Sequence, residues 1–189
     1  MHGRVALAFG DDTAARAGRL TFNPLRHIDP IGTVALPALL LFLHLPVFGY
    51  AKPVPVDFRR LNPPRFGMVA VAAAGPLTNF ALAASSAIAF KFVNTLPLAG
   101  LTAYLLPRLL EASVAVNVML GVFNLLPLLP LDGGRVLAGI MPAALARGYA
   151  RLERFGFLLL LLLLYTDWFE AMIYPVIRTI TRTLLWGVE

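Results

Sequence analysis

The sequence predicts an all-α polytopic membrane protein with about four transmembrane helices and a short β-hairpin-like element near the N-terminus. Composition is the first observation, because 59% of the 189 residues are hydrophobic and 14% are charged, whereas soluble domains average roughly 25% charged residues. Length is the second. Four apolar stretches reach the ~20 residues that a helix needs to cross a bilayer: residues 31–50, 66–90, 112–131 and 155–177. Spans this close together leave no room for a soluble domain, so residues 1–189 are predicted to form one membrane-embedded domain.

The first 30 residues are predicted to contain a helix end followed by β and turn structure. His2 to Phe9 has the pattern of the last two turns of a helix, and Gly10-Asp11-Asp12 is a turn signal that ends it. Residues 19–22 alternate as a short strand does. Residues 48–58 are predicted to be extended as an edge strand or loop, since Pro53 and Pro55 exclude helix there. No signal-peptide core is expected, because this segment is too polar.

Three further segments carry their own local signals. Residues 66–90 are rich in alanine, which favours close helix packing, and Gly75-Pro76 predicts a kink that would expose the amide of Asn79. An alternative is that Asn79 only satisfies a carbonyl freed at that kink. Residues 92–110 are apolar but punctuated by Pro and Gly, which predicts a re-entrant or interfacial loop. After residue 177, Arg178 and Arg182 lie one turn apart, as in an interfacial amphipathic helix.

Composition also limits the partners and the chemistry. The chain has no cysteine, which excludes disulfides, thiol nucleophiles and cysteine-based zinc sites. The net charge of +6 is spread over the loops, as expected for contact with anionic lipid headgroups of the bilayer. No basic patch interleaved with aromatic residues is present, so no nucleic-acid partner is predicted.

Residues 124–135 form the most informative segment of the chain. Asp132 follows a run that carries no charge from residue 112 to residue 131, and an ionisable group at membrane depth is costly unless it is functional. Pro127 and Pro130 are predicted to break the helix before it, and Gly133 and Gly134 would let other groups approach the backbone closely. Two hypotheses stay open on these residues alone: a functional carboxylate, or an N-cap of the next helix.

Taken together, three motifs resemble the site-2 protease family of intramembrane zinc metalloproteases. They occur in the family's order and cover residues 2–141, about three-quarters of the chain. They are Asn23-Pro24 with His27-Ile28-Asp29-Pro30 and Gly32; Gly75-Pro76 with Asn79; and residues 124–135 with Leu131-Asp132-Gly133-Gly134.

The resemblance implies a zinc endopeptidase that cleaves a transmembrane protein substrate with metal-activated water. In the family, a His-Glu-x-x-His helix supplies two zinc ligands and the catalytic glutamate, and the Asp of a Leu-Asp-Gly motif is the third ligand. Asp132 matches that third ligand and His2 matches the second histidine. The first histidine and the general-base glutamate would then precede Met1, so no catalytic residue is expected within these 189 residues.

Three explanations of this departure stay open: a misassigned start of a longer active protein, a truncated relic, and a non-catalytic pseudoprotease that binds membrane helices. Asn79 and Asn124 are candidates to hold the unwound substrate backbone. His27 also resembles a family feature near the site, although a turn residue bonded to a carbonyl is the favoured interpretation. His44 lies in the first predicted span, where a helix-packing hydrogen bond is favoured over the alternative of a cavity-facing group. An ion carrier is a weaker hypothesis, because carriers commonly show internal repeats and this sequence shows none.

Overall fold

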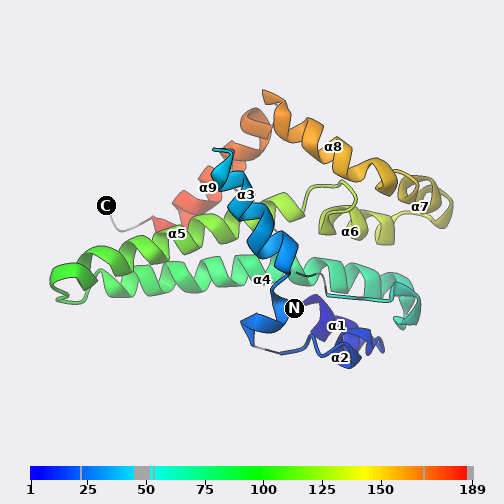
Figure 1. The fold of residues 1–189 in the computed structure, drawn as a ribbon, viewed down its shortest axis with the longest axis horizontal. Coiled ribbons are helices and arrows are strands. Elements are labelled where there is room, and N and C mark those ends of the chain that lie inside the picture. The colour runs from blue at the N-terminus through cyan, green and yellow to red at the C-terminus, as the bar shows by residue number, and fades with distance from the viewer. Residues whose placement is uncertain (22, 45–51, 53, 168, 187–189) are drawn as a thin grey trace. The chain divides into compact units, whose positions relative to one another are not determined.

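The computed structural model describes residues 1–189 except 22, 45–51, 53, 168 and 187–189. The described residues are helical or irregular and contain no β-strand, which confirms the all-α part of the predicted fold. The chain divides into two compact units, Met1–Gly67 and Met68–Glu189, and each is described separately below. Figure 1 shows the order of the helices along the chain.

Unit 1 begins with the helix α1 (His2–Ala8) and the short helix α2 (Thr13–Arg16). A turn at Phe9–Gly10 separates them, and Gly10 has a positive φ of 97° that favours glycine. The predicted helix end and turn signal are therefore confirmed. Three further helical segments follow: a 3₁₀ turn (Pro24–His27), a π-helical turn (Pro30–Ala35) continuous with α3 (Leu36–Phe42), and a 3₁₀ turn (Phe58–Arg60).

The predicted strand over residues 19–22 is not formed at the described positions 19–21. Local side-chain bonds replace a strand ladder there: the Asn23 amide donates to Thr21 Oγ1 at 3.1 Å, and the Arg19 guanidinium donates to the Arg26 carbonyl. Such bonds compete with extended pairing. The described part of the second extended segment, residues 52 and 54–58, contains no strand either, while residues 48–51 and 53 lie outside the described part of the chain.

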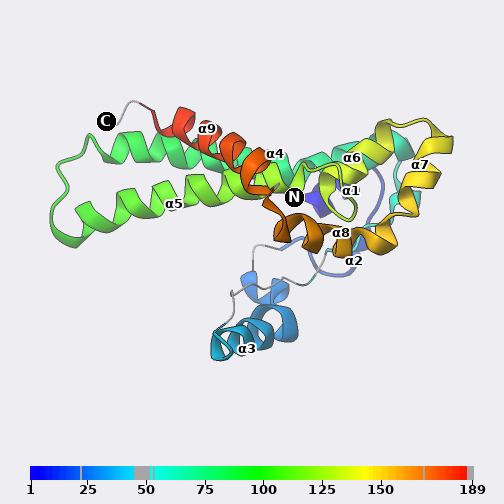
Figure 2. The ribbon, with the colours of Figure 1, turned by 90° about the horizontal axis from the view of Figure 1, so that it is seen from above.

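Unit 2 is built around two long helices. Helix α4 (Pro64–Val93) starts within unit 1 and supplies most of its length to unit 2, and α5 (Gly100–Asn124) returns beside it, as Figures 1 and 2 show. Both are long and apolar enough to cross a membrane. Only 33% and 17% of their most apolar stretches are buried within the chain, so both expose apolar surface that a soluble protein would cover.

The predicted loop over residues 92–110 is wrong from residue 100 onward, because α5 begins at Gly100 and passes through Pro107. Gly100 has a positive φ of 62°, so it shapes the entry to the helix. A proline within a helix removes one backbone donor. The residues on either side of Pro107 are rich in leucine and alanine, which are good helix formers, so α5 continues through it. At the other end, residues 125–131 are not helical. The observed helix, Gly100–Asn124, therefore begins and ends earlier in the sequence than the predicted span 112–131.

Two other predicted spans are not long helices in the described residues. The apolar helix that covers the start of span 31–50 ends at Phe42, and residues 45–50 lie outside the described residues. Span 155–177 is divided into α8 (Glu153–Tyr165) and α9 (Tyr174–Leu185). Thr166 is extended after α8, so one continuous helix does not form. The chain is helical again in a π-helical turn (Phe169–Ile173) that leads directly into α9. Two membrane-length helices, and not four, are therefore found in the part that the structure describes.

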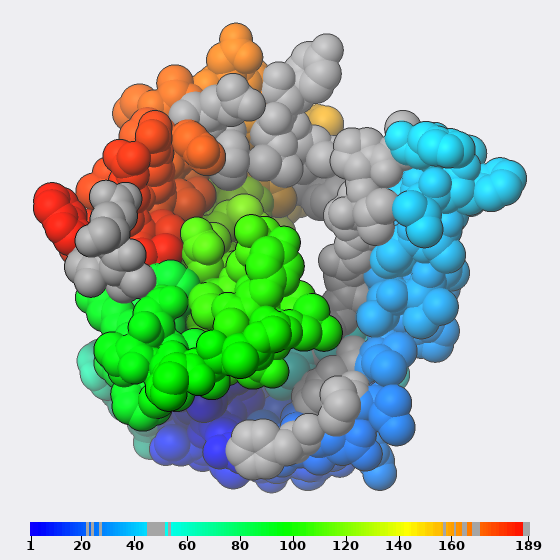
Figure 3. All heavy atoms as spheres, turned by 90° about the vertical axis from the view of Figure 1, so that its left-hand side faces the viewer, coloured from blue at the N-terminus to red at the C-terminus, as the bar shows by residue number. Residues whose placement is uncertain are grey.

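Helix α9 packs against the long pair. Ile177, Ile180, Leu184 and Leu185 contact a buried cluster of Ala83, Ala87, Val114 and Val118 from α4 and α5, and Figure 3 shows α9 (red) against the green of the pair. Arg178 and Arg182 are exposed. The predicted amphipathic helix is thus confirmed, with its apolar side on protein; its placement at a membrane interface stays a prediction.

Candidate functional site

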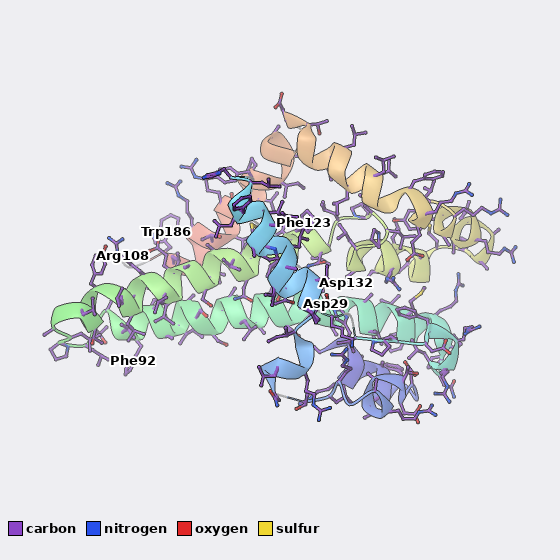
Figure 4. The ribbon with its side chains drawn as sticks, viewed as in Figure 1. Asp29, Phe92, Arg108, Phe123, Asp132 and Trp186 are labelled. Atoms are coloured by element: carbon purple, nitrogen blue, oxygen red, sulfur yellow. The ribbon has the colours of Figure 1, made fainter. Side chains whose placement is uncertain are left out.

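Asp132 is the first residue of α6 (Asp132–Ile140), directly after the non-helical residues 125–131, here called the proline loop. Figure 4 shows it at the opposite end of α5 from Arg108. The N-cap of α6 is Leu131, which makes no side-chain cap bond, so the alternative that Asp132 is the N-cap is wrong. Its half-buried carboxylate lies in the first turn, where the helix dipole favours a negative charge.

The glycines after Asp132 pack directly on the proline loop. A β-carbon on Gly134 would lie 2.5 Å from the Leu129 amide nitrogen, and one on Gly133 would overlap the Leu125 carbonyl. Backbone cannot rotate away from such a contact. The prediction that these glycines permit close approach is confirmed, and the approaching group is the protein's own loop.

Asn124 ends α5 immediately before this loop. Its Nδ2 donates to the Leu120 carbonyl at 2.9 Å, and the residue is half-buried. One amide donor is thus committed within the helix, while the side-chain oxygen is an acceptor. Asn124 and Asp132 flank the same short loop, which the sequence order already required.

Asn79 lies on α4, three residues after Pro76, and is half-buried. In this turn Thr78 Oγ1 donates to the Ala74 carbonyl at 2.6 Å. Within the described part of the chain, no hydrogen bond from the Asn79 side chain to a backbone carbonyl is found. The alternative that Asn79 satisfies a freed carbonyl therefore has no support here.

His2 is the first residue of α1 and is half-buried. The next residue, Gly3, packs so tightly that a β-carbon there would lie 2.8 Å from Ala14 Cβ and 2.9 Å from Leu20 Cδ2. Ala6 is fully buried. Helix α1 is therefore held firmly within unit 1 by its small residues, and His2 lies on an ordered element.

Asp11 is the buried charge that organises unit 1, and its side chain is 0% exposed. Its carboxylate accepts bonds from the Thr13 amide at 3.0 Å, from the Thr13 hydroxyl and from the Asp57 amide at 2.8 Å. Burial raises the pKa of Asp11, but these hydrogen bonds and the charge of Arg60 outweigh it and hold the pKa below its ordinary value. The sequence suggested only a turn here, because the partner Asp57 is 46 residues away.

Two residues that contact the proline loop were not predicted. Tyr149 on α7 (Ala143–Ala150) donates its hydroxyl to the Pro127 carbonyl at 2.8 Å, and Gly156 on α8 packs on Leu129. A glycine inside an apolar leucine-rich helix was the available signal for Gly156. His44 is exposed with a φ of 55° just after α3, and no packing hydrogen bond of its side chain is found among the described residues. The side chain of His27 lies outside the described residues.

The donor types of His2 and Asp132 fit zinc, which takes imidazole nitrogen and carboxylate oxygen. His2 belongs to unit 1 and Asp132 to unit 2. A catalytic zinc has three protein ligands, and no group of three or more His, Cys, Asp or Glu is found among the described residues. The chemistry of the two donors therefore fits, but the set is incomplete within the part of the chain that the structure describes.

The described residues are all helical or irregular, with two helices long and apolar enough to cross a membrane and a half-buried aspartate beside a glycine-packed proline loop. Residues 99–164 match the model of Peptidase family M50. Over 179 residues the chain is 35% identical to "Putative zinc metalloprotease YwhC" of Bacillus subtilis (strain 168), an alignment that covers 94% of this chain and 78% of that protein. No solved structure matches. The chain belongs to peptidase family M50, the site-2 protease family.

Proposed function

We propose that this protein is a site-2-type intramembrane zinc endopeptidase of the cell membrane that hydrolyses a peptide bond within a transmembrane segment of another protein. Family membership supports the reaction class. The observation that carries the proposal is Asp132, a half-buried carboxylate at the start of α6, one short loop beyond a membrane-length helix. An ionisable group in that setting is expected to be functional.

His2 and Asp132 are the residues that would hold the metal. Zinc, when bound, supplies a Lewis acid for the scissile carbonyl and makes a bound water acidic enough to attack near neutral pH. Asp132 would contribute a negative charge that the first turn of α6 stabilises. The third ligand and the general base are proposed to be the His-Glu pair that the family motif places before Met1.

Asn79 and Asn124 are proposed to hold the substrate backbone. A transmembrane helix must unwind before its carbonyl is accessible, and the freed backbone groups need hydrogen-bond partners where water is scarce. The amide of Asn79 offers both a donor and an acceptor. Asn124, with one donor committed to Leu120, offers its oxygen to a substrate N–H.

The first test measures zinc content and cleavage of a transmembrane peptide by the protein purified from its own cells, at the length it has there. Asp132→Asn should lower zinc affinity and cleavage by at least about 100-fold, since even residues that merely orient a ligand cost about 10–100-fold. Asp167→Asn, at an exposed aspartate of the same unit, is the control and should change neither. Unchanged zinc and cleavage in Asp132→Asn would overturn the proposal, and a zinc-free, inactive native protein would favour the helix-binding pseudoprotease.

A second test separates substrate binding from metal binding. Asn79→Ala should slow cleavage while zinc content stays intact. Asn94→Ala is a matched control, because Asn94 follows the end of the same helix and is exposed. Loss of zinc in Asn79→Ala would contradict the substrate-binding role.

A further inference from the structure

The proline loop, residues 125–131, is the only covalent link between Asn124 and Asp132, so its conformation sets the distance between the two proposed site residues. Within the loop, the Leu128 amide donates to Leu126 at 2.7 Å and the Leu131 amide donates to Leu128 at 2.8 Å. Pro127 and Pro130 have no N–H to give. The loop therefore has few internal bonds of its own, and contacts from outside must hold it.

Gly156 supplies one such contact from the buried side of α8. A β-carbon at this position would lie 2.7 Å from the carbonyl carbon of Leu129 and 2.9 Å from Cδ of Pro130, and would overlap the Leu129 oxygen. These atoms are backbone and a proline ring, which have no rotamer to move into. Only glycine permits α8 to lie directly on the loop.

Tyr149 supplies the second contact, from α7. Its hydroxyl donates to the Pro127 carbonyl at 2.8 Å across 22 residues of sequence. Burial raises the pKa of Tyr149, which keeps the phenol protonated as a donor. The Arg135–Glu153 ion pair at 3.1 Å further joins α6 to the start of α8, so the segment that carries both contacts is itself tied to the Asp132 helix.

We propose that Tyr149 and Gly156 are positioning residues that hold the proline loop and thereby set Asp132 and Asn124 in their working geometry. The importance of that geometry rests on the proposed function; the contacts on the loop do not. Residues 141–165, which carry these two contacts, then help to position the site, although none of them is a candidate ligand. A shift of the loop at Leu129 would displace Asp132, which follows three residues later.

The experiment compares two variants with two matched controls in the full-length protein in detergent. Gly156→Ala adds a β-carbon that prevents α8 from lying this close to the loop, and Gly148→Ala is its control, because a β-carbon at that helical glycine meets nothing within 4 Å. Tyr149→Phe removes one hydroxyl, and Tyr104→Phe is its control at an exposed tyrosine on α5. Amide hydrogen exchange over residues 125–132, zinc affinity, kcat and KM are measured on each.

In Gly156→Ala, exchange over residues 125–132 should rise by about 10-fold or more and zinc affinity should fall by about 10–100-fold, the usual effect of losing a group that orients a ligand. In Tyr149→Phe, exchange should rise about fivefold, as expected for one lost hydrogen bond, with a smaller loss of zinc. The controls should match the wild type. The loss of activity should appear in kcat, whereas a purely structural role would lower the thermal midpoint and leave zinc affinity and kcat unchanged.

Exchange equal to that of the controls in both variants would overturn the proposal. So would faster exchange combined with wild-type zinc affinity and kcat, since the loop would then not position Asp132. If Gly156→Ala loses its helical circular dichroism, Tyr149→Phe alone decides. If the wild-type protein takes up no zinc, the proposed function fails, and exchange still decides whether Tyr149 and Gly156 hold the loop.

Discussion

In both units a glycine packs tightly beside a proposed site residue, Gly3 after His2 and Gly133 after Asp132, but the units differ in what else holds these residues. In unit 1 a buried charge, Asp11, ties together segments that are short and irregular. In unit 2 bare glycine backbone packs on the proline loop beside Asp132. The difference shows how each region compensates for what its sequence lacks: short helices lack apolar contact area, and a proline-rich loop lacks backbone donors.

In unit 1 the polar links run between segments distant in sequence. Asp11 accepts from the Asp57 amide, Arg60 pairs with Asp12 at 2.7 Å, and the Asn62 amide donates to the Phe9 carbonyl at 2.8 Å. Helices of seven and four residues bury little surface and are not stable alone. These bonds give α1, and hence His2, a defined place within the unit.

In unit 2 the polar side chains of the long helices mostly bond within their own helix. The hydroxyls or amides of several residues donate to the carbonyl one turn back; these are Thr78, Ser85, Asn94, Asn117 and Asn124. That arrangement satisfies polar groups without water, as a bilayer requires. The proline loop is held instead by close packing on glycine and by the hydroxyl of Tyr149, which lies outside the long helices.

The largest effect is expected for Gly133→Ala. Its β-carbon would collide with the backbone of Leu125 and Leu126, and an overpacked site costs about 1–3 kcal/mol, with the upper end expected where backbone must move. Thermal unfolding in detergent measures this loss of stability, and amide hydrogen exchange over residues 125–132 measures the loosening of the loop. A wild-type melting curve would show that glycine packing does not stabilise this loop. Gly148→Ala, in open space, should be neutral or slightly stabilising.

Asp11→Asn tests the polar half of the comparison. The amide nitrogen of asparagine would face a backbone or hydroxyl donor, which leaves buried groups unpaired and should cost about 2–3 kcal/mol. Faster exchange at residues 2–17 and 54–61 is expected, with α5 as the internal reference. Asp29→Asn is the control, because asparagine also caps a helical turn and Asp29 accepts only local amide bonds. Equal exchange in both variants would refute the role of Asp11.

Acid should weaken unit 1 through the same carboxylate. Because the folded-state pKa of Asp11 is lowered, its stabilisation is fully present above the ordinary value of 3.8 and is lost as the pH falls through the folded-state pKa. Protection factors in unit 1, which are corrected for the intrinsic pH dependence of amide exchange, should therefore fall below about pH 4. In Asp11→Asn this acid step should be smaller, and an identical step in both proteins would assign it to other carboxylates.

The smallest effect is expected for Ser113→Ala. Its hydroxyl shares a 2.9 Å hydrogen bond with Ser86 between α4 and α5, and such bonds within membrane proteins average only about 0.6 kcal/mol. A change in melting temperature near the detection limit is expected. A loss comparable to that of Asp11→Asn would show that unit 2 also depends on polar links, and the contrast between the units would disappear.

Local signals along the chain were sufficient for several features. The turn at Gly10, the helix break at Pro127 and Pro130, and the close backbone approach at Gly133 and Gly134 follow from residues that act on their immediate neighbours. Spans were predicted less well, because hydropathy does not distinguish one helix from two. Hydropathy joined α8 and α9. The proline and glycine pattern, in turn, predicted a loop over residues 92–110, although α5 passes through Pro107.

The sequence by itself determined the membrane class, the family motifs and the candidates His2, Asn79, Asn124 and Asp132, because composition, charge and motif order are properties of the chain alone. Only the tertiary structure decided what holds these candidates. The Asp57 amide on Asp11, the Tyr149 hydroxyl on Pro127 and the Gly156 backbone on Leu129 all join residues more than 20 positions apart. No local pattern encodes such pairings, since they exist only once the chain has brought the partners together.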